Sequence, residues 1–334
     1  MHKNIMDSVM KIAICAIAKE EGLYLTEWIA YHKLLGFDII IADNGGDDNT
    51  SSLLQKFHAN KIIYRINFID YPTSPQIPAY RALARVAKKL KYDIIIFLDI
   101  DEFFSCSFPP KELIPENGVD YVSNLFNKHK LSQLSLHWIC YGSKTDTDDT
   151  TKPVLSRFMH HSNEEEFWNV NTKSFVKINE YFTFLNWFYK GPPIFGVHFQ
   201  PTANKKWLID NTLYKKMDFT KKNSYNNGCI LHFQLKSWAE YQRKIKRGDA
   251  AFTNNKNNKD YFKVHDYNYE KTELSEVLLN QLTTQIHRYN ELNIIYKKSD
   301  NIDGIHLSKG LSNVGDQFKI KYKLLMFIKN LFGL

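Results

Sequence analysis

The stretch that decides the fold is Tyr92-Asp93-Ile94-Ile95-Ile96-Phe97-Leu98-Asp99-Ile100-Asp101-Glu102-Phe103-Phe104, an apolar run that ends in three carboxylates. Unbroken apolarity, in place of alternation, predicts a strand buried on both faces, as in a parallel α/β sheet. Asp99 and Asp101 then lie at the carboxyl end of this strand. Because ligands of open α/β sheets bind at that edge, both side chains are predicted to face one crevice.

The residues before this stretch alternate between strand and helix patterns. The order β-α-β-α-β-α-β predicts a right-handed, doubly wound, mostly parallel sheet of the Rossmann-like α/β class. The strands are expected at 11–18, 37–42, 61–68 and 92–99, and the helices at 23–35, 50–57 and 78–90.

The pattern is looser after residue 110. Residues 131–141 and 174–178 read as strands, 144–152 as a polar loop, and 223–228 and 254–259 as turns. The span 167–199 is crowded with aromatic residues. These aromatics suit either a platform on which sugars stack or an ordinary core.

Composition limits the class of protein and of partner. The chain has 334 residues, 43% of them hydrophobic, which is enough to bury a sizeable core. Its 44 Lys and Arg against 36 Asp and Glu give a charge of +8, which favours anionic partners such as nucleotide diphosphates or lipid headgroups. The basic residues are spread along the chain without a zinc-finger or RNP motif, so no nucleic acid partner is expected.

Cysteine usage and hydropathy predict a location inside the cell. The four cysteines are widely separated and lie in or beside apolar runs, as buried free thiols in a reducing compartment do. Residues 10–18 lack the cleavage site of a signal peptide. No run approaches the roughly 18 apolar residues that span a bilayer. We expect a cytoplasmic protein, or one that is peripheral on the cytoplasmic face of the inner membrane.

The paired acids after the buried strand predict a specific chemistry. Carboxylate oxygens at Asp99 and Asp101 suit Mg²⁺ or Mn²⁺, which in turn bridge phosphate oxygens. Such a pair is expected of an enzyme that uses a nucleotide sugar. His232 is a candidate third ligand, because neutral imidazole binds Mn²⁺. The alternatives are an acidic loop at a strand end and a buried, hydrogen-bonded histidine.

Six ordered blocks between residues 12 and 248 resemble motifs of a known group of enzymes. The blocks are Ala16-Ile17-Ala18-Lys19-Glu20-Glu21 with Leu25 to His32; Leu35-Gly36-Phe37 with Asp43-Asn44-Gly45; Asp99 to Phe103; Trp138 to Ser143; Lys173 to Val176 with Gly196-Val197-His198; and His232 to Ser237 with Glu240-Tyr241, Lys244 and Arg247-Gly248. In this order they resemble the family 2-like and family 92 glycosyltransferases. Two departures are Glu20, where asparagine is usual, and Phe233, where tyrosine is usual.

The resemblance implies the GT-A fold and the transfer of a sugar from a nucleotide donor, usually with Mn²⁺ or Mg²⁺. It places a metal at Asp99, Asp101 and His232. It implies that the nucleotide or its diphosphate contacts Ala18, Glu20, Asp43, Arg81, Asp99, Ile100 and Lys236.

Several of these residues can also be explained by a role in the fold that involves no ligand. Asp43 would contact the base, which favours uridine, or accept a hydrogen bond in an Asx turn. Lys236 and Arg247 would reach a phosphate or remain solvated, and Arg81 would approach the diphosphate or lie on an exposed helix face.

An inverting transfer also needs a general base near the acceptor hydroxyl. The candidates are clustered in 146–149 and 164–166 and at two later positions. They are Asp146, Asp149, Glu165, Glu180 and His198, and the sequence does not choose among them.

The chain is expected to divide into a GT-A domain at 1–253, with a donor half at 1–108 and an acceptor half at 109–253, and a helical extension at 254–334. The extension ends in a basic amphipathic helix at 317–334, which suits a membrane interface, a packing helix or an oligomer contact.

The sequence therefore predicts a metal-dependent glycosyltransferase with a UDP-sugar donor, UDP-galactose being preferred on the resemblance alone. The acceptor is expected to be a glycan or lipid-linked saccharide, as in bacterial surface polysaccharide or lipopolysaccharide synthesis. The alternatives are a sugar nucleotidyltransferase and a non-catalytic carbohydrate-binding protein on the same scaffold.

Overall fold

The structure is a computed structural model, and it describes residues 10–69, 75–107, 112–145, 149–179, 207–209, 212–214, 225–248 and 259–293. All of these belong to one compact unit, which extends to Tyr296.

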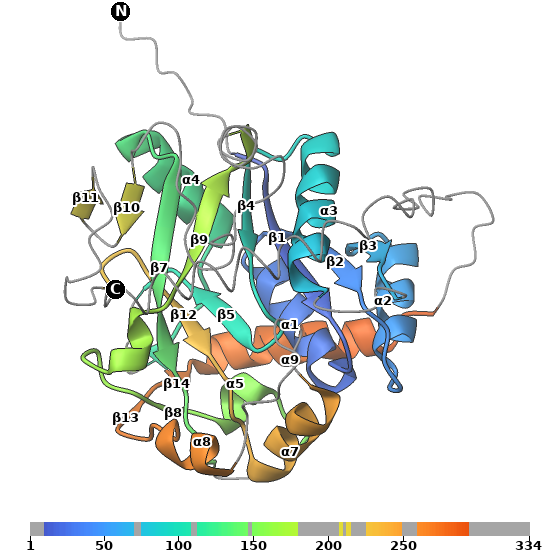
Figure 1. Cartoon of the computed structure of the whole chain (residues 1–334), viewed down its shortest axis with the longest axis vertical. Coiled ribbons are helices and arrows are strands. Elements are labelled where there is room, and N and C mark those ends of the chain that lie inside the picture. The colour runs from blue at the N-terminus through green and yellow to red at the C-terminus, as the bar shows by residue number, and fades with distance from the viewer. Residues whose placement is uncertain are drawn as a thin grey trace, which may run out of the picture. The chain divides into compact units, whose positions relative to one another are not determined.

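The first half of the sheet is parallel and follows the order β4-β1-β2-β3 (Figure 1). Ala18 at the end of β1 pairs with Asp43 at the end of β2. The predicted doubly wound arrangement is therefore confirmed. The strands are β1 (Ile12–Ala18), β2 (Asp38–Asp43), β3 (Tyr64–Asn67) and β4 (Ile94–Phe97), and the helices are α1 (Gly22–Leu34), α2 (Thr50–Ala59) and α3 (Gln76–Lys89).

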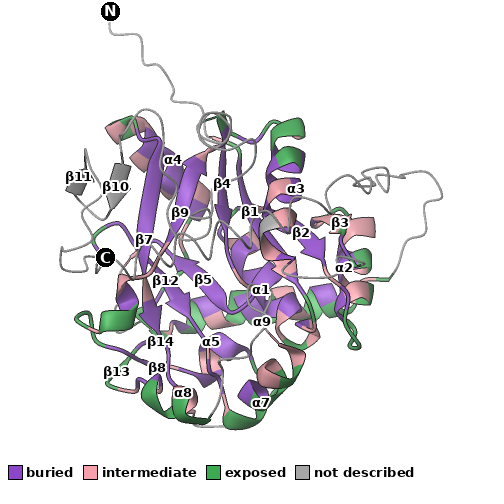
Figure 2. Cartoon of the chain, viewed as in Figure 1, coloured by how far each residue is buried: buried purple, intermediate pink, exposed green. Residues whose placement is uncertain are grey.

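Both faces of this parallel half are covered, which explains the continuous apolar runs. Ile94 and Ile96 of β4 belong to the main core, which includes α1. Phe97 faces the other side, where its ring stacks on Tyr80 of α3 at 4.2 Å between centroids. Figure 2 shows β1, β2 and β4 buried over almost their whole length, whereas β3, at the end of the strand order, is only partly buried.

The second half of the sheet is mixed. Strand β9 (Thr172–Lys177) is antiparallel to both of its neighbours, β4 and β7 (Gln133–Cys140). Strand β12 (Cys229–His232) is parallel to β7 and antiparallel to β5 (Glu102–Ser105). The remaining described strands of the sheet are β10 (Trp207–Ile209) and β11 (Thr212–Tyr214).

Several elements of this half are absent from the sequence expectation, β10, β11 and β12 among them, and two others contribute to the main core. One is β5, which begins at the last acid of the deciding stretch. The other is α4 (Gly118–His129), whose Asn117 side chain accepts a hydrogen bond from the Asp120 amide as an N-cap. Its buried Phe126 joins the main core, as do Phe37, Phe104 and Phe175, which contact one another.

The remaining elements cover the sheet and its carboxyl edge. They are β6 (Glu112–Leu113), α5 (Val154–Arg157), β8 (His160–His161), η1 (Phe167–Val170), α7 (Trp238–Arg247), α8 (Lys259–Val264), β13 (Glu270–Lys271), β14 (Glu273–Leu274) and α9 (Glu276–Asn290).

The described residues beyond 253 pack on the same unit as the sheet. Strands β13 and β14 pair with β8 and β6, and α9 packs on α1. The expected amphipathic helix at 317–334 lies outside the described residues. Among the described helices, none is long and apolar enough to cross a membrane.

Candidate functional site

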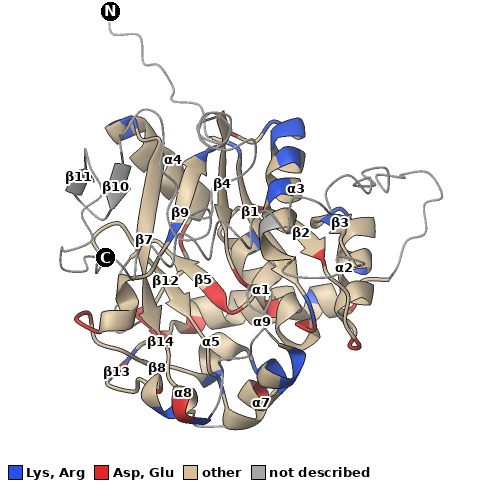
Figure 3. Ribbon diagram, viewed as in Figure 1, with Lys and Arg blue, Asp and Glu red and all other residues tan. Residues whose placement is uncertain are grey.

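The ends of β1, β2 and β4 meet at one edge of the sheet. The amide of Leu98 donates to the carbonyl of Cys15 at 3.0 Å, and the amide of Asn44 donates to Ala18 at 2.9 Å. Asp99, Asp101 and Glu102, here called the acidic edge, follow β4 at this place. Figure 3 shows acidic residues at the centre of the sheet and basic residues along α7.

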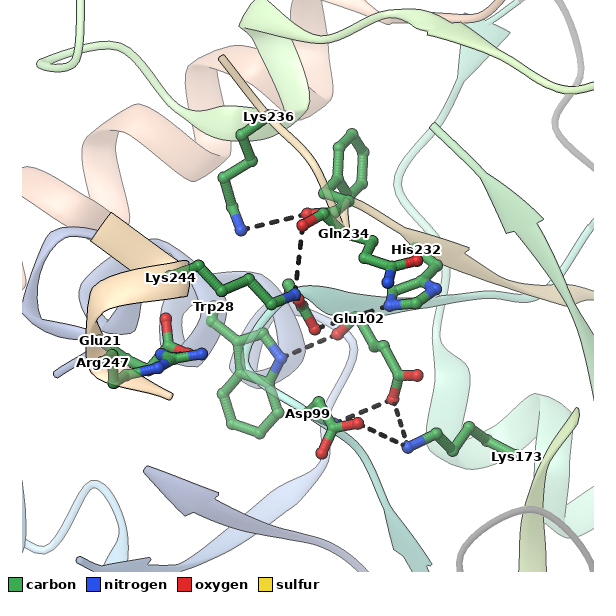
Figure 4. A network of polar contacts seen from close by, with 12 residues as sticks. Glu21, Trp28, Asp99, Glu102, Lys173, His232, Gln234, Lys236, Lys244 and Arg247 are labelled. Atoms are coloured by element: carbon green, nitrogen blue, oxygen red, sulfur yellow. Dashed lines mark hydrogen bonds and ion pairs between the residues drawn. The ribbon is translucent and has the colours of Figure 1, made fainter. Parts of the chain in front are cut away.

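Asp99 and Glu102 share one buried lysine, Lys173 (Figure 4). The Lys173 ammonium lies 2.9 Å from an oxygen of each carboxylate and is completely buried. Glu102 Oε2 also accepts the amide of Asp99 at 2.9 Å. Asp99 keeps an exposed face, with 37% of its side chain accessible, and Tyr80 donates to it at 3.4 Å.

The protonation states follow from burial and from these pairs. Burial raises the pKa of Glu102 to about 8, although Lys173 opposes the shift. Burial also disfavours the charge of Lys173, but the two carboxylates outweigh it and raise the lysine pKa above its usual range. Burial would raise the pKa of Asp99 as well, yet Lys173 holds it below the ordinary value. Lys173 therefore acts as a built-in counter-ion.

Asp101 has a different partner. Lys244 of α7 donates to Asp101 Oδ2 at 2.7 Å and to the carbonyl of Gln234 at 3.1 Å. Burial opposes ionisation of Asp101, but Lys244 outweighs it and keeps the pKa well below the usual range. The other oxygen, Oδ1, lies 3.8 Å from His232 Nε2. Burial lowers the pKa of His232 to about 3, so its ring is neutral.

Two of the three predicted metal ligands therefore face each other in suitable states. An ionised carboxylate and a neutral imidazole are donors that Mn²⁺ accepts, and the Nδ1 atom of His232 is buried without a hydrogen-bond partner. Asp101 and His232 fit a divalent cation. Within the described part of the chain, however, no group of three His, Cys, Asp or Glu side chains is arranged to hold one.

Two further cations come from the segment after β12. Lys236 has a positive φ of 58°, donates to the carbonyl of Phe233 at 3.1 Å and lies over the ring of Tyr24. Arg247, at the end of α7, contacts the carbonyl of Lys19 and the carboxylate of Glu21. Both side chains are at least partly buried here, so neither is simply solvated.

The loop after β1 has a strained residue where the sequence departs from the resemblance. Glu20 has a φ of 51°, a left-handed conformation that asparagine tolerates better than glutamate. A Cβ atom at Gly46 would lie 2.5 Å from Glu20 Cγ, so the loops after β1 and β2 approach closely. This backbone conformation explains why asparagine is usual at the position that Glu20 occupies here.

The contacts of Asp43 are those expected of its structural alternative, an Asx turn. Its Oδ1 accepts from the Gly45 amide at 3.0 Å, as in an Asx turn, and from Ser51 at 2.8 Å. Its Oδ2 pairs with Arg65 at 2.7 Å, and the side chain is fully buried. The contact of Asp43 with a base stays a prediction.

The other predicted donor contacts lie close to the edge. Ala18 ends β1, and Ile100 separates the two aspartates; both are buried. Arg81 is half-buried on α3, next to Tyr80, which reaches Asp99.

The candidate bases are not brought to the acidic edge by any described contact. Asp149 is exposed and accepts from Thr151, and Glu165 lies on an exposed turn. Asp146, Glu180 and His198 lie outside the described residues. The base therefore stays a prediction.

The site residues that sequence reasoning missed are Lys173, Lys244 and Glu102. Each lies within a quoted block, but none was assigned a role. The only local signal for Lys173 was its place directly before the expected strand 174–178. Its complete burial requires ionic partners, because lysine is almost never fully buried unless it is paired.

Comparison with known proteins identifies the group. A model of glycosyltransferase family 92 matches residues 10–278. The chain belongs to glycosyltransferase family 92. The resemblance drawn from the motifs is thereby confirmed, and the fold is an α/β fold of the GT-A type.

A family 92 glycosyltransferase protein of Ricinus communis is 26% identical over 128 residues, which are 38% of this chain and 22% of that protein. The chain thus matches about a fifth of that relative's length.

Solved structures resemble the fold more distantly. Staphylococcus aureus TarS is 12% identical over 54% of this chain and 30% of its own, with a TM-score of 0.34. A putative glucose-1-phosphate thymidylyltransferase from Bacillus anthracis is 10% identical over 80% of this chain and 99% of its own, with a TM-score of 0.35. A glucosyl-3-phosphoglycerate synthase from Mycobacterium tuberculosis in complex with Mn²⁺ and UDP is 16% identical over 39% of this chain and 44% of its own, with a TM-score of 0.24.

Proposed function

We propose that this family 92 glycosyltransferase transfers a sugar from a UDP-sugar, and that the acidic edge receives the diphosphate with a divalent cation. The observation that carries the proposal is the pairing of an ionised Asp101 with a neutral His232 at the carboxyl end of β4. Ligands of open α/β sheets bind at this end.

The chemistry requires positive charge where the glycosidic bond breaks. As the nucleoside diphosphate departs, negative charge grows on its oxygens, and fixed cations stabilise it. A bound Mn²⁺ or Mg²⁺ supplies this charge, and Asp101 and His232 would hold it, with Asp99 beside them. Lys236 and Arg247 lie near the same edge, and we infer that they support the diphosphate.

The chain's own residues set up this site before any donor arrives. Lys173 holds Asp99 and Glu102, and Lys244 holds Asp101 ionised. Arg247 connects α7 to the loop after β1 by donating a hydrogen bond to the carbonyl of Lys19. The acceptor is inferred to be a glycan or lipid-linked saccharide of a bacterial surface polymer, as the motif resemblance suggests.

The test is a panel of nucleotide sugars incubated with Mn²⁺ and assayed for released diphosphate, with and without acceptor extracts. Wild type should release UDP from at least one donor. Asp101→Asn should lower the rate about a hundredfold, since loss of a charged contact to the metal costs several kcal/mol of transition-state stabilisation.

Asp93→Asn is the matched control, because Asp93 is an exposed aspartate at the opposite end of the same strand. It should retain full activity. Equal rates for wild type and Asp101→Asn would refute the proposed role of the acidic edge. Donor binding without turnover across the whole panel would favour a carbohydrate-binding protein.

A further inference from the structure

Four aromatic rings form a continuous row between the surface of the molecule and the acidic edge. Phe167 and Trp168 of η1 contact each other edge to face, with 5.8 Å between their ring centroids. Trp168 lies 4.7 Å from His265, whose ring stacks on Tyr261 of α8 at 3.7 Å. These four side chains are here called the aromatic row.

The inner end of the aromatic row is one residue away from the acidic edge. The Tyr261 hydroxyl accepts a hydrogen bond from the side-chain amide of Gln234 at 2.5 Å. The backbone carbonyl of Gln234 accepts from Lys244 (Figure 4), which in turn donates to Asp101. Gln234 therefore contacts both the last ring of the row and the partner of Asp101.

The outer end of the row is fixed at the same side of the sheet. Strand β7 runs parallel to β4, because β9 lies between them and is antiparallel to both. The carboxyl ends of β4 and β7 therefore share one side. Asn169 of η1 accepts the amide of Cys140, the last residue of β7, at 3.1 Å. Phe167 and Trp168 are thus held at the edge where ligands of open α/β sheets bind.

Phe167 and Trp168 are exposed although both are large and apolar, with 73% and 38% of their surface accessible. In the described part of the chain, the other aromatic side chains that are exposed to a similar degree are Trp238 and Tyr269. Trp238 packs on Phe262 of α8, and Figure 1 shows α7 beside α8. Exposed rings grouped in this way indicate a binding surface, because covering them with a ligand removes apolar area from water.

The chemistry of this surface suits a sugar. The apolar C–H face of a pyranose packs on the face of an aromatic ring, and the hydroxyl groups at its rim need hydrogen-bond partners. Asn163, Glu164 and Glu165, directly before η1, are exposed and supply amide and carboxylate groups there. The three consecutive glutamates at 164–166 disfavour an anionic lipid or a nucleic acid, because like charges repel.

We propose that the aromatic row is the acceptor subsite, with the sugar rings of an oligosaccharide stacked on Phe167 and Trp168 and with Tyr261 at the end near the acidic edge. The inference rests on the proposed function, whose acceptor it defines as an oligosaccharide. Because a pyranose is about as large as one aromatic ring, a single sugar cannot cover the row.

The first test is binding of the fluorescently labelled full chain to a printed array of oligosaccharides, with UDP and MnCl₂ present. Wild type should bind at least one of them. Phe167→Ala should weaken this binding about tenfold, because a ring that is covered by the ligand is lost. Val277→Ala is the control, since Val277 is 58% exposed on the distant α9 and should bind as wild type does.

Trp168 gives a second, conservative comparison. Trp168→Phe keeps a ring and should retain most of the binding, whereas Trp168→Ala should lose as much as Phe167→Ala. Wild type that binds no oligosaccharide of the array, or Phe167→Ala that binds as tightly as wild type, would overturn the proposal. Phe167→Ala alone suffices if Trp168→Ala fails to fold, because the Phe167 side chain is largely exposed.

Fluorine NMR of protein labelled with 5-fluorotryptophan shows where the oligosaccharide found on the array binds. The Trp168 signal is assigned by its loss in Trp168→Phe and should shift as that oligosaccharide is added. A bound oligosaccharide that leaves the Trp168 signal in place would overturn the assignment of the subsite.

The two proposals fail in different ways. Oligosaccharide binding that depends on Phe167, without UDP release from any donor, would support the aromatic row and count against sugar transfer. UDP release by wild type together with binding that ignores Phe167 would do the reverse. Self-association of wild type that Phe167→Ala abolishes in sedimentation, with oligosaccharide binding unchanged, would make the row a contact between copies and would also overturn the proposal.

Discussion

Replacing Arg157 by methionine removes the cation from a buried ion pair that joins α5 to α7. The Arg157 guanidinium donates to both oxygens of Glu240, at 2.7 and 3.1 Å, and the arginine is only 2% exposed. Ser237, the N-cap of α7, and Tyr24 also donate to Glu240. Methionine keeps the apolar stem and leaves the carboxylate without its main partner.

The magnitude follows from the pKa. These hydrogen bonds and the Arg157 charge outweigh burial and lower the pKa of Glu240 to about 2, against an ordinary value near 4.5. A shift of this size corresponds to about 3 kcal/mol, and breaking a buried ion pair typically costs about 3–5 kcal/mol. We expect Arg157→Met to lower the free energy of unfolding by about 3 kcal/mol at pH 7.

The pH dependence provides a second check on the same residue. The folded-state pKa of Glu240 lies below its unfolded value, so its contribution is present above about pH 4.5 and is lost as the pH falls towards 2. Urea unfolding at pH 7 and pH 3 should show the gap between wild type and Arg157→Met shrinking in acid.

Arg243→Met is the matched control, because Arg243 is exposed on the same helix. It should change stability by less than about 0.5 kcal/mol. A cost below about 1 kcal/mol for Arg157→Met at pH 7, or a gap that does not change with pH, would refute this reasoning.

Three further outcomes are expected. Burial raises the pKa of Glu27 to about 7, above its ordinary value. Its contribution to stability is therefore present below about pH 4.5 and is lost as the pH rises to 7. Urea unfolding of Glu27→Gln should show a flatter pH profile of stability than wild type, and parallel profiles would contradict this expectation. The four cysteines are buried free thiols, so a thiol-reactive dye should modify none quickly in the native protein and all four in urea; rapid native labelling would contradict the packing. Phe175→Ala should cost about 3–5 kcal/mol in chemical denaturation, whereas Phe167→Ala, at a side chain that is 73% exposed, should cost less than about 0.5 kcal/mol, and similar costs would disprove the core assignment.

The parallel half of the fold could be predicted because its signals are local. The run Ile94–Phe97 is apolar without a break because both faces of β4 are covered. The predicted strands and helices before it appear with shifts of a few residues at their ends. The acidic edge follows from the same logic, since the carboxyl ends of parallel strands share one side.

The mixed half could not be predicted in the same way, because its pairings join distant segments. Nothing local in 172–177 says that β9 enters between β4 and β7. Strand β5 could not be recognised in the sequence, because it begins at an acid and is only four residues long. For the same reason the sequence identified the aspartates but not their counter-ions, Lys173 and Lys244, which come from remote elements.

The reversed direction of β9 has a consequence for how this enzyme family can diversify. In a wholly parallel sheet, only the connections that follow strands reach the ligand-binding side, and such connections vary readily. Because β9 runs the other way, its first residues reach that side, so Lys173 is supplied from the start of a rigid strand. Exchanging surface connections between homologues to alter donor choice should therefore leave this ammonium group where it is.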